Sequence, residues 1–178
     1  YAEVAAALEC RRCATWIMPC SNDRDFDANW AFHVERFTPI ARILAEAGCS
    51  LGLEFIGPKT LRAAYKYEFV HTMPEMLRPN VGLLLDCWHW YTSHGTVEDL
   101  RALRPEQVVY VHVNDAPAGI PIDEQVDNVR ALPGATGVID IAAFLQALQQ
   151  IGYDGPVTAE PFSKEVNAMP AEEAARVT

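Results

Sequence analysis

The sequence alternates between short apolar runs and longer amphipathic stretches, and this alternation limits the fold more than any other feature. The apolar runs cover 13–19, 50–57, 80–86, 107–115 and 155–162. Runs of this length with few polar positions are typical of strands that are buried on both faces of a parallel sheet. The stretches between them predict helical crossovers, which parallel strands require. The sequence therefore predicts an α/β protein with about five parallel strands.

Helix signals separate most of these runs. A long helix is predicted between Asp27, as its N-cap, and Gly48, as its terminator, because apolar residues recur every three or four positions between them. A helix is also expected over 67–78, despite Pro74 in its interior. Two more helices are predicted, over 96–103 with a capping box at Thr96 and Asp99, and from an Asp140 cap to a stop at Gly152.

The length bounds the architecture. A chain of 178 residues fits one domain, so residues 1–178 are expected to form a single domain. Five strands fit either a small doubly wound sheet or part of a (β/α)8 barrel, since a full barrel needs about 250 residues. No glycine-rich phosphate-binding motif follows any of the runs. A nucleotide-binding open sheet therefore has little support.

Charge and cysteine usage narrow the function classes. The net charge of −10 disfavours nucleic acid as a partner. The sequence contains no run of 18 apolar residues, so no membrane span is predicted. The five cysteines are odd in number and irregularly spaced, which indicates a reducing compartment and a cytoplasmic protein. "CRRC" at 10–13 has zinc-knuckle spacing, but no second pair accompanies it.

Four of the five apolar runs end in a side chain that can bind a metal. These are Glu54 in "LGLEF", Asp86 in "LLLD", His112 in "YVHVND" and Glu160 in "VTAEPF". A single acidic residue at a strand end is usually a helix cap or a loop contact. Four such residues at the ends of neighbouring parallel strands are expected to converge on one face, where active sites form. Three carboxylates and one imidazole suit one divalent ion, Mn²⁺, Mg²⁺, Co²⁺ or Zn²⁺.

As a set, the runs "LGLEFIG", "NVGLLLDCWHW", "VVYVHVND" and "IGYDGPVTAEPF" resemble the xylose-isomerase-like TIM-barrel superfamily. Within it, they are most similar to the sugar-phosphate isomerase/epimerase group, which includes inosose isomerases and ketose 3-epimerases. The resemblance covers residues 13 to 165 and implies the fourth to eighth strands of a (β/α)8 barrel, with outer helices only. It thus implies a C-terminal part of such a barrel, which is expected to be inactive alone.

The resemblance also implies residue roles. Glu54, Asp86, His112 and Glu160 would bind the metal, and His89 and Arg130 would contact the substrate. Arg130 precedes "ALPGATG", where this sequence departs from the shorter turn of the family. The implied chemistry is transfer of a carbon-bound proton through an enediolate, with Glu54 and Glu160 as the catalytic bases. The expected partner is a small sugar, and a homo-oligomer is left open.

Three other functions are compatible with parts of the pattern. A metal-dependent lyase such as an inosose dehydratase would use the same metal and base, and the sequence does not separate it from an isomerase. An endonuclease-IV-like enzyme would need more histidines and a basic surface. A non-catalytic sugar-binding module would be favoured by the loss of a ligand, and all four are present.

Five residues near the predicted strand ends allow two interpretations. The aromatic residues Trp16, Trp88 and Trp90 could form the apolar wall of a sugar site, or could pack in the core. Asn114 and Asp115, which come just after His112, could support the ligands or hydrogen-bond the substrate, or could have a purely structural role.

Overall fold

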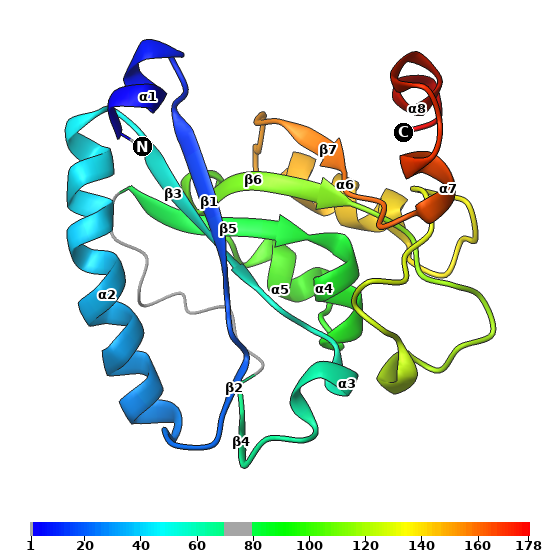
Figure 1. Ribbon diagram of the computed structural model, residues 1–178, viewed down its shortest axis with the longest axis horizontal. Coiled ribbons are helices and arrows are strands. Elements are labelled where there is room, and N and C mark those ends of the chain that lie inside the picture. Colours follow the sequence, from blue (N-terminus) through cyan, green and yellow to red (C-terminus); the bar gives the residue numbers. More distant parts are fainter. Residues whose placement is uncertain (1, 70–79) are drawn as a thin grey trace.

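The computed structural model describes residues 2–69 and 80–178, and a five-stranded parallel sheet dominates them (Figure 1). The strand order β1-β3-β5-β6-β7 follows the chain order, and every neighbouring pair is parallel. The strands are β1 (Arg12–Ile17), β3 (Ser50–Phe55), β5 (Val81–Asp86), β6 (Val108–Val113) and β7 (Val157–Ala159). This arrangement confirms the five predicted strands.

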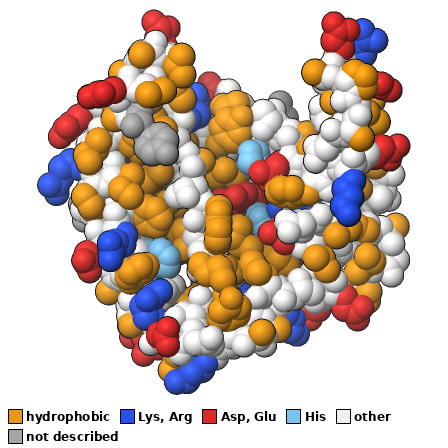
Figure 2. All heavy atoms as spheres, viewed as in Figure 1, with side chains coloured by type: hydrophobic (Ala, Val, Ile, Leu, Met, Phe, Trp, Pro, Cys, Tyr) orange, Lys and Arg blue, Asp and Glu red, His pale blue; other side chains and the backbone are white. Residues whose placement is uncertain are grey.

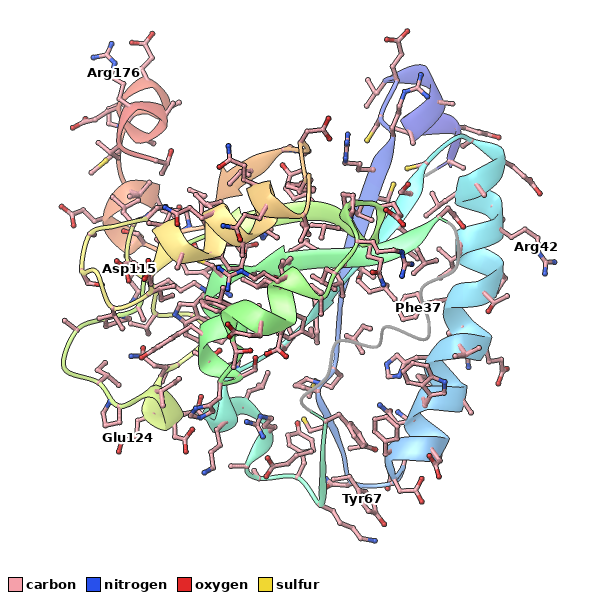
Figure 3. All side chains as sticks on the ribbon, turned by 180° about the vertical axis from the view of Figure 1, so that it is seen from behind. Phe37, Arg42, Tyr67, Asp115, Glu124 and Arg176 are labelled. Carbon is pink, nitrogen blue, oxygen red and sulfur yellow. The ribbon has the colours of Figure 1, made fainter. Side chains whose placement is uncertain are left out.

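Helices cover one face of this sheet, and Figure 3 shows that face with its helices toward the viewer. Beside the first strands lies α2 (Phe26–Glu46), whose Ala41 and Leu44 pack with Leu51 and Leu53 of β3. Behind β5 and β6 lie α5 (Val97–Arg101) and α6 (Ile141–Gln150), where Phe144 is fully buried. The side chains of one strand parity therefore form the core.

The remaining elements are short. They are α1 (Ala2–Ala7), β2 (Cys20–Ser21), α3 (Lys59–Arg62), β4 (Tyr67–Glu68), α4 (Cys87–Thr92), η2 (Pro105–Gln107), η3 (Ile122–Glu124), α7 (Lys164–Asn167) and α8 (Ala171–Val177). Among the described residues, none of the helices is both long and apolar enough to cross a bilayer.

The opposite face of the sheet is hollowed, and none of the elements in residues 2–69 and 80–178 covers it. Figure 2 shows acidic and histidine side chains in the middle of this face, with hydrophobic side chains around them. The second strand parity points here, so Leu84 and Tyr110 line a hollow of about 610 Å³ together with His112. Successive residues of each strand thus point alternately to the helix-covered core and to this hollowed face.

The helix boundaries confirm some sequence signals and correct others. Asp140 caps α6, and Thr96 and Asp99 form the capping box of α5, as predicted. The N-cap of α2 is Asp25 and not Asp27, because the Asp25 side chain accepts the backbone N–H of Ala28.

The prediction of a helix over 67–78 is wrong at its start. Tyr67 and Glu68 form β4, which pairs antiparallel with β2 through Ser21 and Cys20. Cross-strand pairing therefore prevails over the local helical pattern at these two residues. Positions 70–78 of the predicted helix lie outside the described residues.

Candidate metal centre

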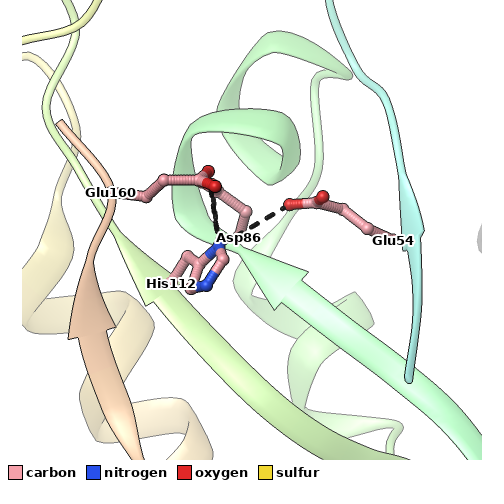
Figure 4. Close-up of side chains that lie close together, drawn as sticks. All are labelled: Glu54, Asp86, His112 and Glu160. Carbon is pink, nitrogen blue, oxygen red and sulfur yellow. Dashed lines mark ion pairs between the residues drawn. The ribbon is translucent and has the colours of Figure 1, made fainter. Parts of the chain in front are cut away.

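Four side chains converge at the carboxyl ends of four consecutive strands (Figure 4). The Nδ1 atom of His112 lies 3.3 Å from Glu160 Oε2 and 3.8 Å from both Glu54 Oε1 and Asp86 Oδ2. One ligand atom from each of the four residues lies within 4.8 Å of all the others. The predicted convergence of the four side chains is therefore confirmed.

The strand register explains why these side chains meet. Asp86 pairs with His112 between β5 and β6, and Glu54 pairs with Leu84, two residues before Asp86. Side chains of one parity share a face, so three of the donors stand side by side over the hollow. Glu160 lies one residue beyond β7, and its side chain is 36% exposed. The strand predicted over 155–162 is therefore shorter than expected, and the Glu160 carboxylate reaches the cluster from just beyond it.

Two donor atoms of this cluster suit a cation. In the described part of the chain, Glu54 Oε1 and His112 Nδ1 are buried and have no hydrogen-bond partner. A buried polar atom without a hydrogen-bond partner lowers the stability of the fold, and these two atoms lie only 3.8 Å apart. A divalent ion accepts lone pairs from both atom types. The donor set therefore fits a metal, and residues 54, 86, 112 and 160 form a candidate metal site.

The electrostatics of the cluster are those of an anionic site. Burial and the negative charges of Asp86 and Glu160 raise the pKa of Glu54 from 4.5 to about 8. Burial acts on Asp86 in the same direction, but His89, Arg130 and the amide of Trp88 outweigh it and hold the pKa of Asp86 below its usual value. The two buried carboxylates thus differ in their preferred protonation states.

Arg130 is the counter-cation of this site. Its Nη1 atom donates to Asp86 Oδ2 at 2.7 Å and to Glu160 Oε2 at 3.0 Å, and its side chain is only 2% exposed. The guanidinium also stacks over the rings of Trp88 and Phe162, with 4.8 and 4.6 Å to the ring centres. A planar cation held by carboxylates and rings is fixed in orientation.

His89 lies against the same guanidinium. Its Nε2 atom is 3.2 Å from Arg130 Nη2 and 3.9 Å from Glu54 Oε1, while its Nδ1 accepts the backbone N–H of Gly57 at 3.1 Å. Burial lowers the pKa of His89, so the neutral ring is favoured. A side chain at Gly57 would collide with the His89 carbonyl oxygen. Glycine is therefore required where the end of β3 meets α4.

Comparison with known proteins agrees with this arrangement. The sequence profile of a family described as xylose isomerase-like TIM barrel matches residues 1–178. This chain belongs to that family.

Three known proteins show the extent of the similarity. An inosose isomerase of Bacillus subtilis (strain 168) is 33% identical over 144 residues, which cover 79% of this chain and 50% of that protein. An L-ribulose 3-epimerase of Methylomonas sp. (strain DH-1) is 27% identical over 161 residues, covering 86% of this chain and 49% of that protein. A crystal structure of the IOLI protein with a bound zinc atom superposes with a TM-score of 0.83 at 25% identity, covering 99% of this chain and 63% of that one. This xylose isomerase-like chain spans about half the length of the curated relatives it matches.

Asn114 joins two of the four donor residues of this xylose isomerase-like chain. Its Nδ2 atom donates to Asp86 Oδ2 at 3.1 Å, and its Oδ1 accepts the backbone N–H of Glu160 at 3.0 Å. The residue is fully buried, and its backbone N–H contacts the Cys87 thiol. Asn114 therefore ties the end of β5 to the end of β7.

Asp115 has a different role from its neighbour. It is fully buried, and its carboxylate accepts the backbone N–H groups of residues 116, 136, 137 and 139. Its own backbone forms a bridge with Ala131. Asp115 lies at the base of the 116–139 loop and Glu124 on its outer part (Figure 3). It therefore fixes the loop that carries Arg130.

The tryptophans divide between the two interpretations left open by the sequence. Trp88 and Trp90 are 0% and 9% exposed and belong to the hydrophobic core. Trp16 pairs in register with Glu54 and is 56% exposed, so it lies beside the candidate metal centre.

One site residue was missed by sequence reasoning. Asp127 Oδ1 accepts from Arg130 Nη2 at 3.0 Å and lies 3.8 Å from His89 Nε2. The spacing of three residues between Asp127 and Arg130 is compatible with this ion pair. It indicates a site residue only after the structure shows that Arg130 lies at the donor cluster.

Proposed function

We propose that this chain contributes the metal centre of an isomerase or epimerase that acts on a sugar, a keto-inositol or a sugar phosphate. The observation that carries this proposal is the convergence of four donor side chains, two of which present buried atoms without a hydrogen-bond partner. The names of the similar proteins, an inosose isomerase and an L-ribulose 3-epimerase, support the substrate class.

Glu54, Asp86, His112 and Glu160 would hold the ion in this proposal. Bound there, a divalent cation would polarise a substrate carbonyl and stabilise the negative charge of an enediolate. Mn²⁺, Mg²⁺, Co²⁺ and Zn²⁺ all suit three carboxylates and an imidazole. The zinc in the similar crystal structure supports zinc as the first ion to try.

The two glutamates are placed to move the proton. They come from opposite ends of the donor row, and Figure 4 shows their carboxylates approaching His112 from different sides. One carboxylate would take the proton from the carbon beside the carbonyl, and the other would return it. The raised pKa of Glu54 favours a protonated carboxyl at neutral pH in the absence of a cation, so Glu54 is suited to carry a proton.

The remaining residues would bind and orient the substrate. His89 and Arg130 lie within reach of the donor cluster and present N–H groups or a ring nitrogen to oxygens of a sugar. The exposed ring of Trp16 stands opposite Glu54 and offers an apolar surface to the C–H face of a sugar ring. Asp127 would keep the Arg130 guanidinium in place through its carboxylate and its backbone carbonyl.

The test is exchange of a carbon-bound hydrogen with solvent deuterium in the full-length protein. The protein would be stripped with a chelator, reloaded with Zn²⁺ or Mn²⁺, and incubated with inososes, ketoses and ketose phosphates in deuterated water. We expect metal-dependent exchange with at least one of these substrates, with products of unchanged mass apart from deuterium.

The alternative outcomes are distinct. Loss of water from a substrate would indicate a lyase on the same scaffold, because a lyase expels hydroxide from the same enediolate. If the metal-loaded protein exchanges no carbon-bound hydrogen with any of these compounds, the proposal is wrong. Glu98→Gln is a suitable matched control for variants of the site, because the Glu98 side chain is 78% exposed on α5.

A further inference from the structure

The cysteines of the "CRRC" run lie at the end of the sheet opposite to the metal centre. Cys10 precedes β1, Cys13 is its second residue, and Cys49 immediately precedes β3. The Sγ atoms of Cys13 and Cys49 are 3.4 Å apart, although 36 residues separate them in the chain. The Cys10 thiol instead donates to the carbonyl of Arg12 at 3.0 Å. The spatial partner of Cys13 is therefore Cys49.

The three thiols differ in their access to solvent. Cys10 is exposed and Cys13 is partly exposed, whereas Cys49 is 1% exposed in the core formed with α2. Burial, followed by the contact with Cys13, raises the pKa of Cys49 to about 11. An oxidant in solution therefore meets Cys13 before Cys49, and Cys49 is protected from direct reaction.

We propose that Cys13 and Cys49 are a modification site, at which a hydroperoxide or a small disulfide produces a reversible Cys13–Cys49 disulfide. The sulfurs must approach by about 1.4 Å to reach the length of a disulfide bond. Their strands are already adjacent and in fixed register, with Cys13 opposite Leu51 and the Ser50 N–H bonded to the Arg11 carbonyl at 2.9 Å. The two sulfurs therefore start in contact, on neighbouring strands that the sheet holds together.

The reaction balances with a hydroperoxide as oxidant. The Cys13 thiolate attacks one peroxide oxygen, the O–O bond breaks, and Cys13 becomes a sulfenic acid while the alcohol or water leaves. Cys49 sulfur then attacks Cys13 sulfur, the S–O bond breaks, and the hydroxide leaves as water with the proton of the Cys49 thiol. Two thiols lose two electrons, and the peroxide gains them. A thiol reductant reverses the change by exchange.

The bond would close a large part of the chain. It links β1 to the start of β3 and encloses α2, so the oxidised unfolded chain loses conformational freedom. We expect the oxidised protein to unfold at a temperature about 5–10 °C higher than the reduced protein. A Cys10–Cys13 bond would close a loop too short for this effect.

The test is disulfide mapping of the full-length protein, stripped of metal with a chelator and treated with hydrogen peroxide or oxidised glutathione. Free thiols are alkylated, and the digest is analysed by mass spectrometry with and without reductant. The expected product is a reductant-sensitive peptide pair that joins Cys13 to Cys49 in most molecules. A Cys10–Cys13 bond as the main product, or no intramolecular bond, would overturn the proposal.

Two variants separate the pair from its neighbour. Cys10→Ser should keep the Cys13–Cys49 bond and the rise in unfolding temperature, whereas Cys49→Ala should lose both. Since Cys49 is buried, its variant can fail to fold, and the mapping of the unmodified protein then decides alone. If Cys10→Ser also abolishes the bond, Cys10 is the reacting thiol and the assignment of the Cys13–Cys49 pair is wrong.

Discussion

Replacing Glu54 with glutamine removes an ionisable group while keeping the size of the side chain. In the metal-free protein, the pKa of Glu54 is raised to about 8 from its ordinary value of 4.5. The native state therefore holds this proton up to about pH 8, whereas the unfolded chain releases it near pH 4.5. Rising pH favours the state with fewer protons, which is the unfolded one. The stability linked to Glu54 is thus complete below pH 4.5 and is lost as the pH approaches 8.

The size of the effect follows from the shift. The shift in the pKa of Glu54 corresponds to a loss of at most about 5 kcal/mol in the free energy of unfolding between pH 4.5 and pH 8. Glutamine stays neutral throughout, so Glu54→Gln should match the wild type near pH 5 and exceed it by a few kcal/mol near pH 9. The assay is urea unfolding of the chelator-treated full-length protein across this range, followed by tryptophan fluorescence, with Glu98→Gln as the exposed control.

Adding a metal ion tests the same cause from the other side. A divalent cation should replace the proton of Glu54, so it should stabilise the wild type most at high pH, by about 2.7 kcal/mol at a hundredfold excess over the dissociation constant. The gain should be smaller in Glu54→Gln. If the free energies of unfolding of the wild type and Glu54→Gln change with pH in parallel in the absence of metal, the argument is refuted. Such profiles would show that Glu54 has the same pKa in the folded and the unfolded chain.

Three further predictions concern the site. Glu54→Gln and Glu160→Gln should each lower turnover at least roughly a hundredfold with metal still partly bound, measured by solvent deuterium exchange and metal content; near wild-type exchange in both variants would exclude them as bases. Asn114→Ala should weaken metal affinity roughly ten- to a hundredfold in calorimetric titration, and unchanged affinity would contradict its role in joining Asp86 to Glu160. Gly57→Ala should lower the free energy of unfolding by about 1–3 kcal/mol in urea, because its side chain would meet the backbone carbonyl of His89 in α4; an unchanged midpoint would refute this.

The sheet and the donor cluster could be predicted because both depend on local pattern. Apolar runs mark the strands, and alternation along a strand decides which side chains share a face. Glu54, Asp86 and His112 end such runs at the same parity, so their meeting follows once the strands are parallel and in chain order. Glu160 was predicted by the same rule and reaches the cluster from just beyond its strand.

The arrangement around the donors could not be predicted in the same way. The contact between Arg130 and Asp86 joins residues 44 positions apart, and its geometry depends on a long loop that has no repeating pattern. Asn114 likewise reaches the backbone of Glu160 across 46 positions. The start of the 67–78 segment became a strand because β2 is its neighbour in space. Such pairings are set by tertiary contacts, which override local propensity.

The anchoring of the 116–139 loop by Asp115 divides that segment into two parts with different tolerance to change. The Asp115 carboxylate holds residues 136–139, and its backbone holds Ala131, so the stretch around Arg130 is held at fixed length. The turn at Gly119 is different, because the space around it is open within 4 Å, although its φ of +78° favours glycine at that one position. We therefore expect an insertion at this turn to leave the Arg130 guanidinium in place. The turn at Gly119 can change in length while Arg130 and its carboxylate partners keep their positions.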